Sequence, residues 1–191
     1  SLPKTILMNT LFVGTVAFDS IETPYGKAPR VLGGSATYAS LSASYFSKKN
    51  KLLSVVGHDF PKEHISLFQK KSISTEGLVV KQKEKTFFWS GRYHKNMDIR
   101  DTLETQLNVL ASFNPVVPSS YQDCSILLLA NLDPSIQASV FSQIKKRPRL
   151  VVLDTMNFWM DNSFSSLLKA VKFADVLMIN EEEAVQLSGE K

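Results

Sequence analysis

Apolar runs of strand length alternate with stretches of helical periodicity along most of this chain. Strands are expected at residues 10–18, 52–57, 125–131, 149–154 and 175–180. Helices are expected at residues 35–49, 62–71, 135–146, 163–174 and 181–191. Strands that alternate with helices in this way form βαβ units, in which neighbouring strands pair in parallel. The order of elements therefore predicts an α/β fold with a doubly wound, mostly parallel sheet.

Two segments interrupt this alternation. Residues 20–32 hold Pro24, Gly26 and Pro29 between short extended pieces, and residues 76–95 look like two strands joined around a lysine-rich turn. Neither segment has a helix attached to it. We expect them to form a small antiparallel β flap, or lid, that stands off the main sheet.

Two adjacent glycines, Gly33 and Gly34, precede the first expected helix. Glycine permits positive φ and lets a backbone approach a ligand closely, at a cost in conformational entropy. The simpler explanation is a tight turn at a closely packed helix N-terminus, because an isolated glycine motif is weak evidence for a site. The helix that follows is expected to place on one face Ala36, Ala39, Ala43 and Phe46.

The composition is that of an ordinary globular protein. The 191 residues are 43% hydrophobic and 21% charged, which is enough for one good core. The net charge of +4 comes from scattered lysines with short clusters at residues 48–49 and 145–147, so no nucleic-acid partner is expected. Cys124 is the only cysteine and is expected to be a packed residue rather than a nucleophile. A cytoplasmic location fits, and no apolar run approaches membrane-spanning length.

Polar side chains follow each expected parallel strand. They are Asp19, Asp59, the pair Asn131 and Asp133, the pair Asp154 and Asn157, and the pair Asn180 and Glu183. The carboxyl ends of parallel strands line one edge of a sheet, and ligands bind in the crevice there. Carboxylate and amide oxygens suit substrate hydroxyl groups and a hard cation such as Mg²⁺. This edge is the expected binding site.

Each of these polar residues also has a purely structural explanation. Asn180 and Glu183 have the spacing of a helix capping box, and Asp154 and Asn157 are residues that favour turns. His58 is expected to be a surface histidine, and the single cysteine leaves no zinc-ligand spacing. The phosphate-loop, dinucleotide and nucleophile-elbow glycine motifs are absent, which argues against those three enzyme classes.

Taken together, the motifs resemble those of the PfkB, or ribokinase-like, family of carbohydrate and nucleoside kinases. The matching residues occur in family order and run through essentially the whole chain: Gly14-x-x-x-x-Asp19, the Gly-Gly-Ser-Ala of residues 33–36, Gly57-x-Asp59, Asp154 with Asn157, and Asn180-x-x-Glu183. The paired glycines and the Asn-x-x-Glu are each weak alone and fairly specific together. The resemblance implies that residues 1–191 form one incomplete domain, the N-terminal two thirds of that fold.

The resemblance also implies a set of site residues. Those expected to bind the substrate are Asp19, Gly33, Gly34, Ser35, Tyr38, Arg92, Asn131 and Asn157. Those expected near the nucleotide phosphates are Asp154, Asn180 and Glu183, with Glu183 holding Mg²⁺ through water. The implied cofactors are ATP and Mg²⁺, with a monovalent cation as a further candidate. The flap would close over the sugar or nucleoside, and a homodimer could form through it.

The chain departs from the family pattern in its substrate-binding region. Tyr38 stands where many family members have Asn, and Ala17 stands where ribokinases carry a second polar contact to the sugar. The flap is unusually aromatic, with Phe87, Phe88 and Trp89. Aromatic faces can cover a sugar ring or stack on a base, and they can equally form the packed core of the flap. These departures point away from plain ribose.

The family's G-x-G-D motif does not occur among the 191 residues. That motif supplies the catalytic base and a helix-N-terminal anion site. No catalytic residue is therefore expected within this stretch, the base is expected after Lys191, and the stretch alone is expected to be inactive. The expected activity is ATP-dependent phosphoryl transfer to a substrate hydroxyl. The alternatives are a non-catalytic sugar-binding or regulatory module, and a plain scaffold without a ligand.

Overall fold

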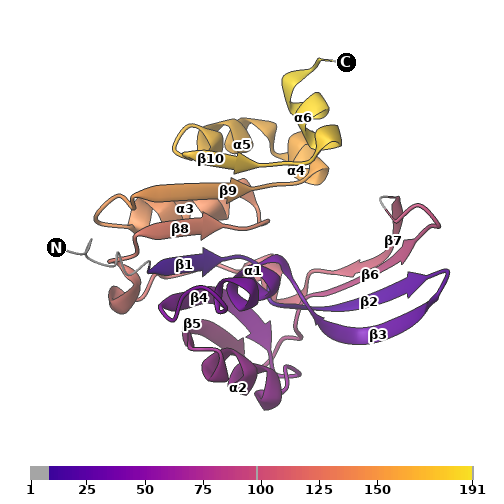
Figure 1. Cartoon of the computed structure of the whole chain (residues 1–191), viewed down its shortest axis with the longest axis horizontal. Helices are drawn as coiled ribbons and strands as arrows, with labels where there is room; N and C mark the ends of the chain where they lie inside the picture. The colour runs from indigo at the N-terminus through magenta and orange to yellow at the C-terminus, as the bar shows by residue number, and fades with distance from the viewer. Residues whose placement is uncertain (1–8, 98, 191) are drawn as a thin grey trace.

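A parallel β-sheet forms the centre of the computed structural model, which describes residues 9–97 and 99–190. Within these residues the sheet has six strands in the order β10-β9-β8-β1-β4-β5, and every pair is parallel (Figure 1). Its strands are β1 Thr10–Val13, β4 Asn50–Gly57, β5 Ile73–Lys81, β8 Ile126–Leu129, β9 Leu150–Asp154 and β10 Val176–Met178.

Helices cover both faces of this sheet because its strands are apolar on both sides. One face packs against α1 Ser35–Ala43 and α2 Lys62–Lys70. The other face packs against α3 Pro134–Gln143, α5 Phe164–Val171 and the 3₁₀ turns η1 Asn108–Ser112 and η2 Ser119–Tyr121. Two further helices, α4 Asn157–Asn162 and α6 Glu181–Ser188, follow β9 and β10. The predicted doubly wound α/β fold is confirmed.

Successive strand residues supply the two cores in alternation. Leu11 and Val13 point into the core beneath α3 and α5, whereas Phe12 points into the core beneath α1 and α2. Leu11, Leu127 and Leu153 are fully buried, and each such side chain contributes about 1.5–3 kcal/mol relative to an exposed one. This burial on both faces gives the sheet a rigid carboxyl edge that can position a site.

A second sheet, which we call the flap, stands off the end of the main sheet (Figure 1). Its order is β3-β2-β6-β7, with β2 Ala17–Thr23, β3 Gly26–Gly33, β6 Phe88–Tyr93 and β7 Arg100–Gln106. The flap is mixed rather than purely antiparallel, because β2 and β6 pair in parallel. The predicted lid is thus present, but its strands and their pairing differ from those expected.

Several expected boundaries are corrected. The run 10–18 is two strands, because the chain leaves the main sheet at Gly14 and enters the flap at Ala17. Residues 76–81 belong to β5 of the main sheet, where they pair with β4, and are not part of the flap. The fourth flap strand, β7, was not expected, because its residues are all exposed and, apart from Leu103, polar, and therefore show no apolar pattern.

The first helix is shorter than its periodicity suggests. It ends at Ala43, where the Ser44 hydroxyl donates a 2.6 Å hydrogen bond back to the carbonyl of Leu41. Phe46 therefore lies beyond the helix and is 89% exposed, so the expectation that it shares a helical face with Ala36, Ala39 and Ala43 is wrong.

Cys124 is buried, and this burial raises the pKa of its thiol to about 11. A thiol with so high a pKa is protonated at neutral pH and is a poor nucleophile, as expected from the sequence. Among the described residues, no helix is both long and apolar enough to cross a membrane.

Candidate active site

Three of the five polar strand ends have clear structural roles. Asp133 caps α3 by accepting a 2.7 Å hydrogen bond from the Ser135 N–H. Asn180 caps α6 in a complete capping box, with Glu183 bonded back to the Asn180 N–H at 3.0 Å. Asp59 accepts hydrogen bonds from the N–H and the hydroxyl of Thr86, in the loop before β6. Capping and loop anchoring are thus enough to explain their residue types.

The other two carboxylates, Asp19 and Asp154, differ in their electrostatics. Burial raises the pKa of Asp19, although a hydrogen bond from the Gly34 N–H partly offsets this effect. Burial likewise raises the pKa of Asp154, and the negative charge of Glu183 adds to the increase. Asp154 is the last residue of β9, whereas Asp19 lies within the flap strand β2 and not, as expected, at the end of a main-sheet strand. Carboxylates that a fold holds at raised pKa are candidates for binding or catalysis.

The two glycines form the junction between the flap and the main sheet. A Cβ added at Gly33 would lie 2.1 Å from Asp19 Oδ2, so this glycine leaves room for the carboxylate. Gly34 has φ +99°, and a Cβ there would lie 2.4 Å from the carbonyl oxygen of Thr15. The close approach at Gly34 is therefore to the protein's own backbone, as the turn explanation requires.

Thr15, in the loop after β1, caps the N-terminus of α1 through hydrogen bonds. The Ser35 N–H donates to Thr15 Oγ1 at 2.9 Å, and the Ala36 N–H donates to the Thr15 carbonyl at 3.0 Å. The Ser35 hydroxyl also lies 3.1 Å from Thr15 Oγ1. Thr15 thus satisfies the first two N–H groups of the helix, and the Ser35 hydroxyl is engaged in the contact between α1 and the end of β1. This role of Thr15 was not expected from the sequence.

One face of the flap gathers around Asp19. In the β2–β6 register, Asp19 lies opposite Trp89, and side chains alternate along each strand, so Tyr93 shares the face of Trp89. Burial raises the pKa of Tyr38, and the charges of Asp19 and Tyr93 add to this effect. Asp19, Tyr38, Trp89 and Tyr93 thus form one surface, which we call the aromatic face. Tyr93 was not expected, although its spacing of four from Trp89 on a strand indicates it.

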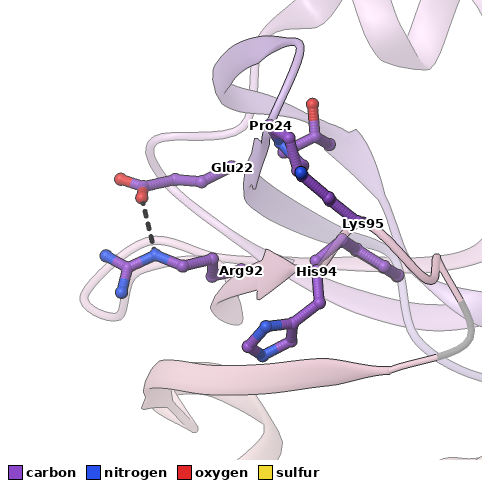
Figure 2. A pocket seen from close by; sticks show the side chains of 7 residues that line it. Glu22, Pro24, Arg92, His94 and Lys95 are labelled. Carbon is purple, nitrogen blue, oxygen red and sulfur yellow. Dashed lines mark hydrogen bonds and ion pairs between the residues drawn. The ribbon is translucent and has the colours of Figure 1, made fainter.

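Arg92 lies on the opposite face of the flap. It pairs in register with Glu22, and its Nε donates to Glu22 Oε2 at 3.1 Å. Both residues line a pocket of about 320 Å³ together with Pro24, His94 and Lys95 (Figure 2). By strand alternation neither Glu22 nor Arg92 points toward Asp19. The structure does not bring Arg92 together with the other expected substrate residues.

The second candidate carboxylate lines an open pocket at the carboxyl ends of β9 and β10. The pocket has a volume of about 560 Å³, and Asp154, Thr155, Asn180 and Glu183 contribute to its lining. Asp154 Oδ2 accepts the Asn131 N–H at 3.1 Å. The Thr155 hydroxyl is buried without a hydrogen-bond partner among the described residues. A polar ligand in this pocket would satisfy that hydroxyl.

The amide side chains of the remaining two expected residues are engaged within the protein. Asn131 Oδ1 accepts the Trp159 Nε1–H at 2.8 Å. Asn157 Nδ2 donates to Gln186 Oε1 at 2.6 Å, which joins α4 to α6. A fully buried glutamine, Gln137, was not expected; its Nε2 donates to three carbonyl oxygens at the ends of β8 and β9. Gln137 therefore fixes the strand ends that carry Asp154.

No protein-family model matches the chain. A cytidine kinase of Thermococcus kodakarensis is 22% identical over 185 residues, which are 96% of this chain and 65% of that kinase. The nucleoside kinase of Methanocaldococcus jannaschii, an archaeal member of the ribokinase family, superposes with a TM-score of 0.75 at 20% identity, over 95% of this chain and 63% of that one. The ribokinase-like fold is thereby established. The neighbours are kinases of the kind that the sequence motifs resemble.

Two further neighbours of ribokinase-like fold carry bound molecules. Ribokinase from Cryptococcus neoformans in complex with ADP has a TM-score of 0.75 at 17% identity, over 96% of this chain and 63% of that one. The nucleoside kinase of Burkholderia thailandensis in complex with inosine has a TM-score of 0.74 at 11% identity, over 95% of this chain and 63% of that one. The chain spans less than two thirds of the length of each of these kinases.

In this ribokinase-like fold, Asp154→Asn is expected to raise the melting temperature at pH 7. Asp154 has a raised pKa, so its ionisation opposes folding above that pKa and has no effect below the unfolded value of about 3.9. Asparagine keeps an oxygen for the Asn131 N–H and removes the charge. The advantage measured by calorimetric melting should therefore shrink from pH 7 to pH 4.

Asp133→Asn is the matched control, because asparagine caps a helix as well as aspartate does. It should melt close to the parent protein at both pH values. If Asp154→Asn also melts like the parent at both pH values, burial at this pocket does not oppose ionisation of the carboxyl group.

Proposed function

We propose that the protein is an ATP-dependent kinase that transfers the γ-phosphoryl group to a hydroxyl of a sugar or nucleoside. Residues 1–191 would form the part of the kinase that binds the substrate. The observation that carries this proposal is the position of Asp19. It is a half-buried carboxylate of raised pKa at the junction of a ribokinase-like sheet with its flap. A carboxylate in that position can accept hydrogen bonds from two neighbouring hydroxyls. Gly33, Gly34 and Tyr38 would border the same hydroxyl-bearing ring.

A nucleoside is the substrate class that we favour. Trp89 and Tyr93 lie on the same face of the flap as Asp19 and offer ring faces on which a base can stack. The names of the relatives agree with this choice, since two are a cytidine kinase and a nucleoside kinase, and a third was solved with inosine. Tyr38, in place of the family's usual Asn, would then contact the substrate through its ring and hydroxyl.

The pocket around Asp154 is the proposed site for the nucleotide phosphates. Neighbours solved with ADP support ATP as the donor. Mg²⁺ is often held by one or two carboxylates together with waters and phosphates, and Asp154 and Glu183 provide that number. The cation would neutralise phosphate charge during transfer. No group of three or more ligating side chains exists among the described residues, so the cation would depend on the nucleotide and water.

The catalytic base is proposed to lie in sequence after Lys191, since these residues contain no G-x-G-D motif. Residues 1–191 would thus be one incomplete domain that binds substrate without turning it over. A monovalent cation and a homodimer through the flap stay predictions of the resemblance. A binding assay is therefore the direct test of this proposal.

Titration calorimetry of the chain with cytidine, inosine, ribose and glucose tests the proposal. A nucleoside should bind, and Asp19→Ala should weaken that binding by about 1.5–3 kcal/mol, or roughly 10- to 150-fold. Glu22→Ala is the control, because Glu22 lies on the same strand and points to the opposite face. Its affinity should equal that of the parent. Binding of none of the four compounds, or equal affinity of Asp19→Ala and the parent, contradicts the proposal.

A further inference from the structure

The strands of the main sheet begin together along one edge. Thr10 pairs with both Asn50 and Ile126, Asn50 pairs with Ile73, and Ile126 pairs with Leu150. Each helix between the strands returns the chain to this edge, which lies opposite the flap and the candidate active site (Figure 1). We call it the amino edge and define it as residues 45–49, 70–72, 145–149 and 172–175.

Basic side chains that are scattered in the sequence gather at the amino edge. Eight of them are exposed or half-buried and form no ion pair within residues 9–97 and 99–190: Lys48, Lys49, Lys70, Lys71, Lys145, Lys146, Arg149 and Lys172. The neighbouring carboxylates are neutralised, Asp123 by Lys51 and Asp175 by Arg147.

This edge makes the charge distribution of the molecule strongly uneven. The eight unpaired cations exceed the formal net charge of +4 for the whole chain, so the remainder of the chain is net acidic. A lysine at a helix C-terminus complements the helix dipole, which accounts for single residues such as Lys70. It does not account for Lys146 and Arg149, which lie beyond the end of α3 at Gln143. A row of cations without ion-pair partners attracts a polyanion.

Two exposed aromatic side chains lie at one end of the row. Tyr45 is 75% exposed and Phe46 is 89% exposed, just after the end of α1. The Lys71 ammonium lies 4.5 Å from the centre of the Tyr45 ring, which places the α2 end of the row beside the aromatics. Exposed rings beside cations are the elements with which proteins hold single-stranded nucleic acid, because bases stack on the rings and phosphates pair with the cations.

We propose that the amino edge binds single-stranded RNA or DNA without regard to sequence. Six strands at the usual spacing make this edge about 24 Å long, and cations occur at both of its ends. An elongated row suits an extended phosphate backbone. The two aromatics lie at one end only, whereas a membrane surface would favour aromatics spread over the whole contact. The backbone would cross the edge, and bases near Tyr45 would stack on its ring and on Phe46.

Fluorescence anisotropy of the chain with a labelled 20-nucleotide oligouridylate, from 25 to 200 mM salt (roughly the range over which phosphate contacts are screened), tests the proposal. The triple variant Lys48→Gln, Lys49→Gln, Lys70→Gln should bind at least about tenfold more weakly at low salt, and its slope of log affinity against log salt should fall by about 2. Phe46→Ser should weaken binding by about fivefold or more.

The matched control neutralises three lysines in the same half of the molecule but at the opposite edge: Lys62→Gln, Lys83→Gln and Lys85→Gln. This variant has the same net charge and should bind within about twofold of the parent, with its salt slope unchanged. Equal losses in the two triple variants would show attraction to net charge alone and overturn the proposal. It is also overturned if the oligonucleotide does not bind, or if the edge instead binds only vesicles containing phosphatidylserine.

Discussion

Replacing Gly34 with alanine is expected to destabilise the protein by about 3 kcal/mol or more, among the largest effects of any single substitution. The residue has φ +99°, a region that L-amino acids rarely adopt, and an added Cβ would lie 2.4 Å from the Thr15 carbonyl oxygen. Moving Thr15 is costly, because it also accepts the first N–H groups of α1. Urea unfolding followed by circular dichroism measures the loss.

Gly189→Ala is the control for this substitution. Gly189 also has positive φ, +70°, but nothing lies within 4 Å of its added Cβ. The strain of a left-handed residue after a helix should cost about 1 kcal/mol. The difference between the two variants therefore isolates the collision with Thr15. Equal losses would mean that the backbone at Gly34 relaxes freely, and that its glycine is not required by the fold.

Replacing Asp59 with alanine is the second large expected effect, a loss of about 2–3 kcal/mol. Asp59 Oδ1 accepts the Thr86 N–H at 2.7 Å and the Thr86 hydroxyl at 2.8 Å, just before β6. Asp59 Oδ2 pairs with the Arg30 guanidinium at 2.7 Å, in β3. One carboxylate two residues after β4 thus anchors β3, through Arg30, and the loop before β6, through Thr86. Its removal leaves the Thr86 N–H without this acceptor.

Arg30 shows how much the flap depends on this carboxylate. It is a non-glycine residue with φ +49°, and its guanidinium lies 4.2 Å from the centre of the Phe18 ring. A left-handed arginine is strained, and the contacts with Asp59 and Phe18 hold it in place. In Asp59→Ala we therefore expect faster amide hydrogen exchange in β3 and β6, whereas exchange in β8 and β9 should follow global unfolding only.

The part of the Asp59 contribution that depends on its negative charge should vanish in acid. Burial pushes the pKa of this carboxyl up, but the hydrogen bonds from Thr86 and Arg30 outweigh burial and hold the pKa below its usual value. Such a group stabilises the fold above the unfolded pKa of about 3.9, and the stabilisation is lost as the pH falls through the lower folded value. The gap between the parent protein and Asp59→Asn should thus close below about pH 4.

Asp123→Ala is the control, because it removes an ion pair from a carboxylate that is 76% exposed. Exposed pairs contribute about 0–1 kcal/mol, so this variant should unfold nearly as the parent does. Asp59→Ala with the stability of Asp123→Ala, and with unchanged exchange in the flap, would contradict the anchoring role of Asp59.

The sequence was sufficient to predict most of the main sheet. Four of its strands, β4, β8, β9 and β10, match expected apolar runs, so periodicity identifies them without any tertiary information. The extent of β1 and the place of β5 in this sheet were not predicted, because they depend on pairing with β4. The capping box of Asn180 and Glu183 could also be predicted from the sequence, because both hydrogen bonds are local and follow from a spacing of three residues. The polar ends of the strands also followed from the parallel topology, since it brings those ends to one edge.

The flap was harder to predict, because its strands are only partly buried. Residues 100–106 form β7 with every side chain exposed, so pairing with β6 rather than an apolar pattern makes them a strand. The face on which a flap residue lies depends on the β2–β6 register, which joins segments about seventy residues apart. That register separates Arg92 from Asp19 and brings Tyr93 to the aromatic face.

By itself, then, the sequence determined the order of elements, the doubly wound sheet and the edge where its polar residues collect, because these depend on local periodicity and short-range spacing. Only the tertiary structure decided which carboxylates are buried at raised pKa, why Gly34 must be glycine, and where the lysines gather. Each of these depends on contacts between distant segments: Thr15 against Gly34, Asn131 against Asp154, and the helix ends that meet along the amino edge. Distances of this kind arise from strand order and register, which no stretch of the sequence contains.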